Sequence, residues 1–511
     1  SVVLLCSGFA LYSFFRLSAA EGQKDFNLYE LVPSATSAVF VTDDVLEFVA
    51  EVDELTCSKN QQYLYVSKLF SYLKQSLYAL SEDTPHGLSR QMNQMLISFH
   101  EPDNERNQVL YCRLGNGDKE LVNRFVRKYI SSLYPPKTFI YKGEEIIIYP
   151  MADGDFLACY LTSDFMALSF QKKLIENVID AYKSGKSLAD DSTFTGIRAP
   201  KKSAAAATIY TRMQGMMGWT EFDMKMKDDF IYFSGITHDA DTCFAFINQL
   251  RQQQSVKGFP GEVLPSTAFY FSRQGITDWV SLLSYGNAQG QSVPARTSEV
   301  QNRDKEFSCY LMENAGQDLV ACLFQREDTL QGAAAVLSLS VADVTEAERM
   351  LRALVNAAPA DEGRRNPRIT FCYTVNKAYP IYRLPQTTLF EQLTSFAEPT
   401  LDVYAAFYGG RLLLAPDADA LAHYIRQLDK GEVLNGAMAY QTGMDHLSDS
   451  YHFMLMADFD HIFQQSENHV RFVPDFFLRN ADFFRHFTLF VQFACADGVV
   501  YPNIVLKYKS E

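Results

Sequence analysis

Gly185, Lys186 and Ser187 are the first candidates for chemistry, because a Gly-Lys-Ser run also closes the phosphate loop of nucleotide hydrolases. That loop needs an earlier glycine, a strand before it and a helix after it, so that backbone N–H groups surround a phosphate. Here Asp180 stands at the earlier glycine position. Apolar residues at helical spacing precede Gly185, namely Ile175, Val178, Ile179 and Tyr182. The segment therefore predicts a helix that Gly185 ends as a C-cap, and no nucleotide site.

The segment "HFMLMADFDHIF" holds the closest gathering of histidines and carboxylates, namely His452, Asp458, Asp460 and His461. These side-chain types ligate metal ions. In a strand, Asp458 and Asp460 share one face while His461 points away, so the group converges only if the chain turns. We expect a surface corner between a strand and a helix.

Two acidic segments are further candidates. "THDADT", with His238 to Asp241 at its centre, offers carboxylates to a cation but lacks the glycine and final glutamate of an EF-hand, which favours a helix N-cap. Asp190 and Asp191 form a carboxylate pair without a counterpart in the matching later segment. No serine-hydrolase, zinc-protease or Cys/His motif is present. We therefore predict no catalytic residue, no cofactor-binding residue and no metal ligand.

The nine cysteines form no C-x-x-C motif, and their number is odd. Several stand in apolar, strand-like segments, which predicts small buried hydrophobic residues rather than a disulfide framework. They are Cys112, Cys159, Cys309, Cys322, Cys372 and Cys495. A few disulfides remain an open alternative.

The segment around Gly185 recurs later in the chain. "DFMALSFQKKLIENVIDAYKSGKSL" matches "GRLLLAPDADALAHYIRQLDKGEVL", in which Gly431 falls on Gly185. Both copies predict a strand, an amphipathic helix and a terminating glycine. The apolar helix positions of the second copy are Leu421, Tyr424, Ile425 and Leu428.

The match extends in both directions. "LVPSATSAVFV" recurs as "VLPSTAFYF", and "QVLYCRL" with its following helix resembles "AVLSLSV" followed by "TEAERMLRALV", where Thr345 and Glu348 predict a capping box. Self-similarity over this length indicates a tandem duplication. We predict two homologous α+β units, residues 28–258 and 259–511, with largely antiparallel sheets covered by helices on one face.

Two segments predict hairpins. The final apolar runs flank Asp497-Gly498, a strong hairpin signal, and Pro502 is then expected at a sheet edge or bulge. "GWTEFDMKMKDDFIYFSG" predicts two antiparallel strands with Trp219 in the core.

Composition limits the partners. The 511 residues are 47% hydrophobic, 21% charged and 14% aromatic, which is typical of a folded, sheet-rich protein. The formal net charge of −15 argues against a nucleic-acid partner, because phosphates would be repelled.

The first residues predict a membrane anchor. Val2–Phe15 is a continuous apolar run, shorter than the about 20 residues that span a bilayer, and we expect a few preceding residues to complete it. The alternative is a signal peptide cleaved near "LSAAEG". Acidic residues follow the run, as on a translocated side. We expect residues 1–27 to be a single-pass inner-membrane anchor and linker, with the bulk of the chain in the periplasm.

The chain resembles an uncharacterised family of membrane-anchored envelope proteins of the Bacteroidota type. The resemblance is carried by the apolar run Val2–Phe15, by the early "LVPSA" and by the pattern from Ser169 to Leu188. It implies an anchored α+β protein and supplies no catalytic residue. Larger relatives continue into a β-propeller, so a further domain after Glu511 is an open expectation.

Two functions follow as hypotheses. The first is a non-enzymatic periplasmic scaffold or accessory subunit of an inner-membrane or envelope complex, in protein export or outer-membrane biogenesis. It would bind other proteins through its anchor and its sheet and helix faces. The second is a periplasmic protein that binds or hydrolyses lipid or cell-wall material in a cleft between the units, where abundant aromatic residues would line an apolar groove.

Overall fold

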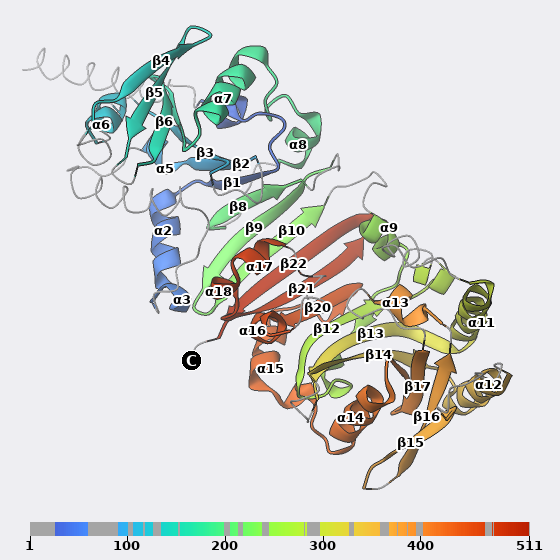
Figure 1. The fold of residues 1–511 in the computed structure, drawn as a ribbon. Coiled ribbons are helices and arrows are strands. Elements are labelled where there is room, and N and C mark those ends of the chain that lie inside the picture. Colours follow the sequence, from blue (N-terminus) through green and yellow to red (C-terminus); the bar gives the residue numbers. More distant parts are fainter. Residues whose placement is uncertain are drawn as a thin grey trace, which may run out of the picture. The chain divides into compact units, whose positions relative to one another are not determined.

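The computed structural model shows an α+β fold with extended antiparallel sheets (Figure 1). Two compact units divide the chain, residues 1–50 with 65–214 and residues 51–64 with 215–511. The residues that the structure describes are 26–59, 90–100, 106–115, 118–125, 134–151, 154–198, 205–212, 218–237, 245–280, 282–283, 297–326, 332–357, 367–375, 377–385, 387–394, 402–465, 473 and 475–509. The expected anchor Val2–Phe15 lies outside them. Within them, no helix combines the length and apolar character that crossing a bilayer requires.

The first unit is built on one antiparallel sheet with the strand order β8-β1-β2-β3-β7-β6-β5-β4. Its strands are β1 (Ala38–Thr42), β2 (Met95–Phe99), β3 (Gln108–Arg113), β4 (Lys137–Tyr141), β5 (Glu144–Pro150), β6 (Phe156–Leu161), β7 (Phe165–Ser169) and β8 (Ala207–Thr211). The order is not sequential, because β7 inserts between β3 and β6.

The helices of this unit follow the apolar spacing of the sequence. They are η1 (Leu28–Leu31), α2 (Val45–Glu54), α5 (Arg90–Asn93), α6 (Asp118–Phe125), α7 (Lys172–Ser184) and α8 (Ser192–Ile197). The apolar face of α7 is buried through Ile175, Val178 and Ile179, against β5, β6 and β7. Gly185 follows α7 with φ 63°, in the left-handed region, so its predicted role as a C-cap is confirmed.

The second unit holds a longer antiparallel sheet with the order β9-β10-β22-β21-β20-β12-β13-β14-β18-β17-β16-β15. Its strands are β9 (Thr220–Lys227), β10 (Phe230–Thr237), β12 (Ala268–Gly275), β13 (Ala315–Gln325), β14 (Ala333–Val341), β15 (Ile369–Tyr373), β16 (Ala378–Pro385), β17 (Asp402–Tyr408), β18 (Arg411–Ala415), β20 (Phe453–Asp458), β21 (Phe487–Ala496) and β22 (Val499–Tyr508). A small separate sheet pairs β11 (Val256–Lys257) with β19 (Ser450–Tyr451).

Helices cover both faces of this second sheet, so the expected coverage of one face is wrong here. On one face, Tyr424 and Ile425 of α14 share a core with Ile381 of β16. Tyr382, the next residue of β16, points to the other face of the sheet. There its hydroxyl accepts a hydrogen bond from Arg352 of α12. The helical segments are α3 (Thr56–Lys59), α9 (Ala245–Arg251), η3 (Pro260–Glu262), α11 (Ser298–Asn314), α12 (Val344–Ala357), α13 (Leu389–Leu393), α14 (Ala418–Asp429), η5 (Leu434–Gly436), α15 (Met438–Met444), α16 (Phe459–Phe463), α17 (Asp475–Arg479) and α18 (Ala481–Phe484).

The same strand order occurs twice. The series β8-β1-β2-β3-β7-β6-β5-β4 and the series β20-β12-β13-β14-β18-β17-β16-β15 have matching connections along the chain. The unit boundary predicted near residue 258 separates these two series. Division of the chain into compact units instead places the boundary at residue 214. The two divisions differ because β10 pairs with β22 and therefore packs with the later part of the chain.

The two predicted hairpins form, but Pro502 does not lie at an edge. β9 pairs with β10, β21 pairs with β22, and Trp219 is buried as predicted. β22 lies between β21 and β10, so Pro502 stands in an interior strand. The ladder with β10 is interrupted opposite Pro502, where Gly235 leaves room for the proline ring. This gap explains how an interior strand tolerates a residue without an N–H.

Two further expectations need correction. The N-terminus of α12 is capped by Asp343, whose carboxylate accepts the N–H groups of Thr345 and Glu346, so the capping box of Thr345 and Glu348 is wrong. Glu348 instead accepts from the Tyr382 hydroxyl. Cys309 is exposed on α11, whereas Cys112, Cys159, Cys322 and Cys372 are buried and free, and Cys495 is half-buried and free.

Candidate functional site

The histidine and carboxylate segment converges only in part. Strand β20 ends at Asp458, which caps α16, and the turn brings His461 Nδ1 within 3.3 Å of Asp458 Oδ2. The expected corner is therefore present, and it brings together two residues that a straight strand would separate. His452 lies elsewhere and accepts the N–H of Cys495. No set of three potential metal ligands gathers anywhere in the described parts of the chain.

Lys509 completes this corner, because its ammonium lies 2.6 Å from Asp458 Oδ1. Burial acts to raise the pKa of Asp458, but hydrogen bonds from His461 and Lys509 hold that pKa below its ordinary value. The hydrogen bond to Asp458 raises the pKa of His461. The geometry is that of an ion-paired cap that ties the end of β22 to α16.

The carboxylate pair Asp190 and Asp191 does not form one site. Asp190 accepts the N–H and the hydroxyl of Ser187, whereas Asp191 caps α8 by accepting the N–H groups of Thr193 and Phe194. Each carboxylate thus holds its own turn. The segment from His238 to Asp241 lies outside the described residues.

A serine–histidine pair that the sequence did not indicate lies in the first unit. Ser98 Oγ is 2.9 Å from His100 Nε2 and 3.0 Å from the hydroxyl of Tyr111. Burial lowers the pKa of His100 to about 4, so its imidazole is neutral at pH 7. Ser98 and Tyr111 are both fully buried, so a substrate cannot reach the hydroxyl of Ser98. The pair satisfies buried polar groups.

An ion network crosses the second sheet. Asp318 on β13 lies between Arg273 Nε, at 3.1 Å, and Arg411 Nη1, at 3.3 Å. Arg411 also donates to the hydroxyl of Ser338, and Arg273 donates to Tyr451. Burial acts to raise the pKa of Asp318, but Arg411 and Arg273 lower it. Because protein groups engage these ions on several sides, the network joins strands of the sheet.

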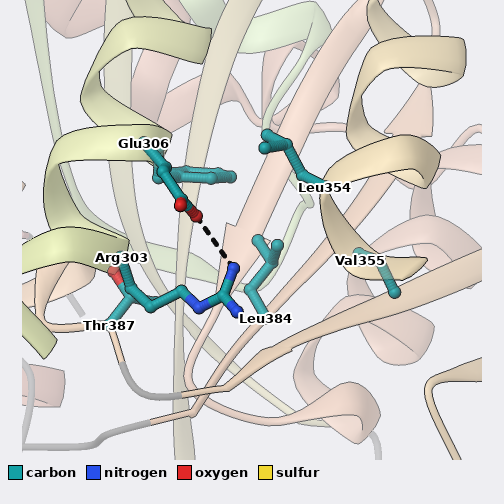
Figure 2. A pocket seen from close by; sticks show the side chains of 7 residues that line it. Arg303, Glu306, Leu354, Val355, Leu384 and Thr387 are labelled. Carbon is teal, nitrogen blue, oxygen red and sulfur yellow. Dashed lines mark hydrogen bonds and ion pairs between the residues drawn. The ribbon is translucent and has the colours of Figure 1, made fainter. Parts of the chain in front are cut away.

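A small cavity lies between α11, α12 and the end of β16 (Figure 2). It is lined by Phe307, Leu354, Val355 and Leu384, and Arg303 crosses it to pair with Glu306 over 2.8 Å. Its volume of about 20 Å³ is room for roughly one water molecule. Ligand pockets are more than tenfold larger, so this cavity does not hold a lipid or a glycan.

One outermost strand of each sheet, β4 in the first and β15 in the second, carries large apolar side chains on the surface. In β4, Phe139 is 43% exposed and Ile140 is 66% exposed. In β15, Phe371 is 53% exposed and Tyr373 is 72% exposed, and Val375 in the following turn is 95% exposed. We call the β15 set, Phe371, Tyr373 and Val375, the β15 edge. Clustered exposed apolar residues mark interaction surfaces.

The β15–β16 hairpin holds these side chains in place. Cys372 points into the core and donates to the carbonyl of Ala422 in α14, so its neighbours Phe371 and Tyr373 occupy the opposite face. The rings of Phe371 and Tyr373 lie 6.3 Å apart. The aromatic pair of the β15 edge therefore stands on a strand that is paired with its neighbour. Figure 1 shows this hairpin at one end of the second unit's sheet.

The segment "ITFCYTV" alternates in the manner of a strand, but nothing in the sequence indicates that this strand lies at a sheet edge. No protein-family model, curated protein or solved structure matches the chain. The candidate site therefore rests on its geometry alone.

Proposed function

We propose that this protein is a non-enzymatic scaffold or accessory subunit of an envelope protein complex, held at the inner membrane by Val2–Phe15 with its bulk in the periplasm. The single observation that carries the proposal is the exposed aromatic edge of β15, with a similarly exposed edge strand, β4, in the first unit. Sheet edges of this kind attract other polypeptides. Export and outer-membrane biogenesis are the processes that such a location suggests.

The repeated strand order supports a duplicated structural unit. Both series connect their strands identically, and equivalent glycines, Gly185 and Gly431, follow the helix in each, both with positive φ. The polar group of Arg411 is not repeated, because Phe165 stands at the equivalent position of the first series. Phe165 of β7 pairs with Arg113 of β3, and Arg411 of β18 pairs with Ser340 of β14. Retained packing with changed polar residues is what we expect of two copies of a scaffold.

The proposal is tested by affinity purification of the full-length protein from its native membrane in mild detergent. Three forms are compared: the wild type, a form lacking residues 1–27, and the double variant Phe371→Ser with Tyr373→Ser. We expect proteins in fixed stoichiometry with the wild type, and their loss from one or both altered forms. Phe139→Ser in β4 is the matched variant that separates the two edges. A wild-type protein that is recovered alone contradicts the proposal.

A further inference from the structure

The residues of β15 alternate between those whose backbone groups bond to β16 and those whose backbone groups point away from it. Arg383 N–H donates to Arg368 O over 2.9 Å, and Thr374 N–H donates to Lys377 O over 3.0 Å. These pairs belong to the same register as Thr370 opposite Ile381 and Cys372 opposite Tyr379. In antiparallel sheets, hydrogen-bonded pairs alternate with pairs that direct their N–H and C=O groups outward. Ile369, Phe371 and Tyr373 therefore direct their backbone groups away from β16.

The outward backbone groups and the exposed rings thus belong to the same residues. Phe371 and Tyr373 each direct an N–H and a C=O outward from the edge of the sheet. Their two aromatic side chains lie on the same face of the sheet. Among the described residues, β16 is the only strand that pairs with β15. A strand added at this edge would gain main-chain hydrogen bonds and cross-strand contacts with two rings.

Each end of β15 carries a cation, although the formal net charge of the whole chain is −15. Arg368 and Lys377, at the two ends of the strand, are both exposed. Arg368 donates to the carbonyls of Val355 and Asn356, and Lys377 lies over the ring of Tyr379. Carboxylates at the ends of an incoming strand would complement them.

We propose that the β15 edge binds an extended segment of another protein as an added antiparallel strand, with apolar residues at its centre and acidic residues at its ends. The inference rests on the proposed scaffold function and names the chemistry of the partner. A lipid surface fits the edge less well, because hydrocarbon cannot satisfy the outward N–H and C=O groups. A second copy of this chain fits less well, because it would bring Arg368 and Lys377 against like charges.

The first test measures binding of a labelled synthetic peptide to the full-length protein by fluorescence anisotropy. The peptide alternates valine and threonine over about seven positions and carries aspartates at both ends, a length typical of strands. Phe371→Val removes the ring but keeps the outward N–H, whereas Phe371→Pro removes both. We expect Phe371→Pro to bind at least about fivefold more weakly than Phe371→Val, the effect of one lost hydrogen bond. Equal affinities of the two variants overturn the proposal.

The charge and the alternative occupants are tested with the same proteins. A peptide with lysines in place of the aspartates should bind at least about fivefold more weakly. Equal binding of the two peptides overturns the proposal that the partner segment has acidic ends. Vesicles of phosphatidylcholine with phosphatidylserine should not bind through this edge. Binding of such vesicles that Tyr373→Ser abolishes assigns the edge to lipid. A dimer by sedimentation that Phe371→Pro dissociates assigns it to a second copy. Either result overturns the proposal.

Hydrogen exchange of the wild-type protein gives a readout that does not depend on a folded variant. At single-residue resolution, the acidic peptide should slow exchange at the amides of Ile369, Phe371 and Tyr373. The amides of Thr370 and Cys372, which already bond to β16, should change little. Equal protection of both sets, or of neither, contradicts strand addition. If membrane partners are recovered but the peptide fails these tests, the inference fails while the scaffold function stands.

Discussion

Ser234 of β10 lies directly opposite Asn503 of β22, and the Ser234 hydroxyl donates to Asn503 Oδ1 over 3.3 Å. Each residue stands six positions after an aspartate with φ 51°, Asp228 in one hairpin and Asp497 in the other. Residues at equivalent positions that face each other across an antiparallel ladder define a local two-fold axis. This is how an isologous dimer interface is built, and it agrees with the duplication proposed above.

Gly235, beside this axis, should not accept a side chain. An added Cβ would lie 2.7 Å from Phe222 Cδ1 and 2.7 Å from Pro502 Cγ. We expect Gly235→Val to lower the free energy of unfolding by about 1–3 kcal/mol, because the neighbouring side chains must shift. Urea unfolding followed by tryptophan fluorescence measures the effect near Trp219. Ser234→Ala, at the exposed neighbouring position, is the control, with a change within about 0.5 kcal/mol. Identical midpoints for the two variants would contradict the packing described here.

Local patterns in the sequence predicted local structure well. Gly185 as a C-cap, the Asp497-Gly498 turn and buried Trp219 all depend on residues close in the chain, and all three are confirmed. The interior position of Pro502 depends on the pairing of β10 with β22, strands more than 260 residues apart. Periodicity along one strand carries no information about which strand lies beside it, so the sequence did not predict the pairing of β10 with β22.

The candidate site was predictable to a smaller degree for the same reason. Phe371, Cys372 and Tyr373 alternate as a half-buried strand does, but only the strand order shows that β15 is outermost and which face α14 covers. Arg273, Asp318 and Arg411 come from separate strands, so their spacing in the sequence gives no signal. Asp458 and His461 were recognised as a corner because both belong to one local turn.

Asp304 on α11 should be important for stability. Its buried carboxylate accepts four hydrogen bonds, from the hydroxyls of Thr387 and Thr388, the N–H of Thr388 and the amide of Gln392. Asp304→Asn replaces an acceptor by a donor that faces other donors. We expect a loss of about 2–4 kcal/mol in the free energy of unfolding, measured by urea titration. Glu306→Gln on the same helix alters an exposed ion pair and should change stability by less than about 1 kcal/mol. A larger effect of Glu306→Gln than of Asp304→Asn would contradict the stabilising role of Asp304.

Arg411→Ala tests the ion network of the second sheet. The variant leaves the carboxylate of Asp318, which is 9% exposed, with Arg273 as its remaining cation. Breaking a buried pair costs about 3–5 kcal/mol, and we expect a loss of that order near pH 7. Because the native pKa of Asp318 is lowered, its stabilising effect is present above about pH 4 and is lost as the pH falls through the native pKa. The difference between wild type and variant should therefore shrink below about pH 4.

Arg349→Ala is the control for this prediction, since the pair of Arg349 with Glu346 is exposed on α12. It should change the free energy of unfolding by less than about 1 kcal/mol at every pH. A loss in Arg411→Ala that stays constant down to pH 2 would indicate that packing of the Arg411 side chain, rather than its charge, stabilises the sheet.

The pKa of His461 should lie above the ordinary value of a histidine. The hydrogen bond to Asp458 raises its pKa, and Lys509 acts in the opposite direction. Asp458→Asn keeps a residue that caps α16 but removes the negative charge, so the pKa of His461 should fall. Lys509→Met removes the competing cation, so that pKa should rise. Titration of the imidazole signals by NMR measures both shifts.

The stability that this pair supplies has a defined pH window. A histidine whose native pKa is raised stabilises the fold fully below the unfolded pKa of about 6.5, and the effect is lost as the pH rises through the native value. The thermal midpoint of the wild type should therefore decline above about pH 6.5 relative to that of His461→Gln, which has no charge to lose. Parallel midpoints of the two proteins from pH 5 to 9, together with an unchanged His461 pKa in Asp458→Asn, would show that the corner is held by the Phe269 ring stacked on His461.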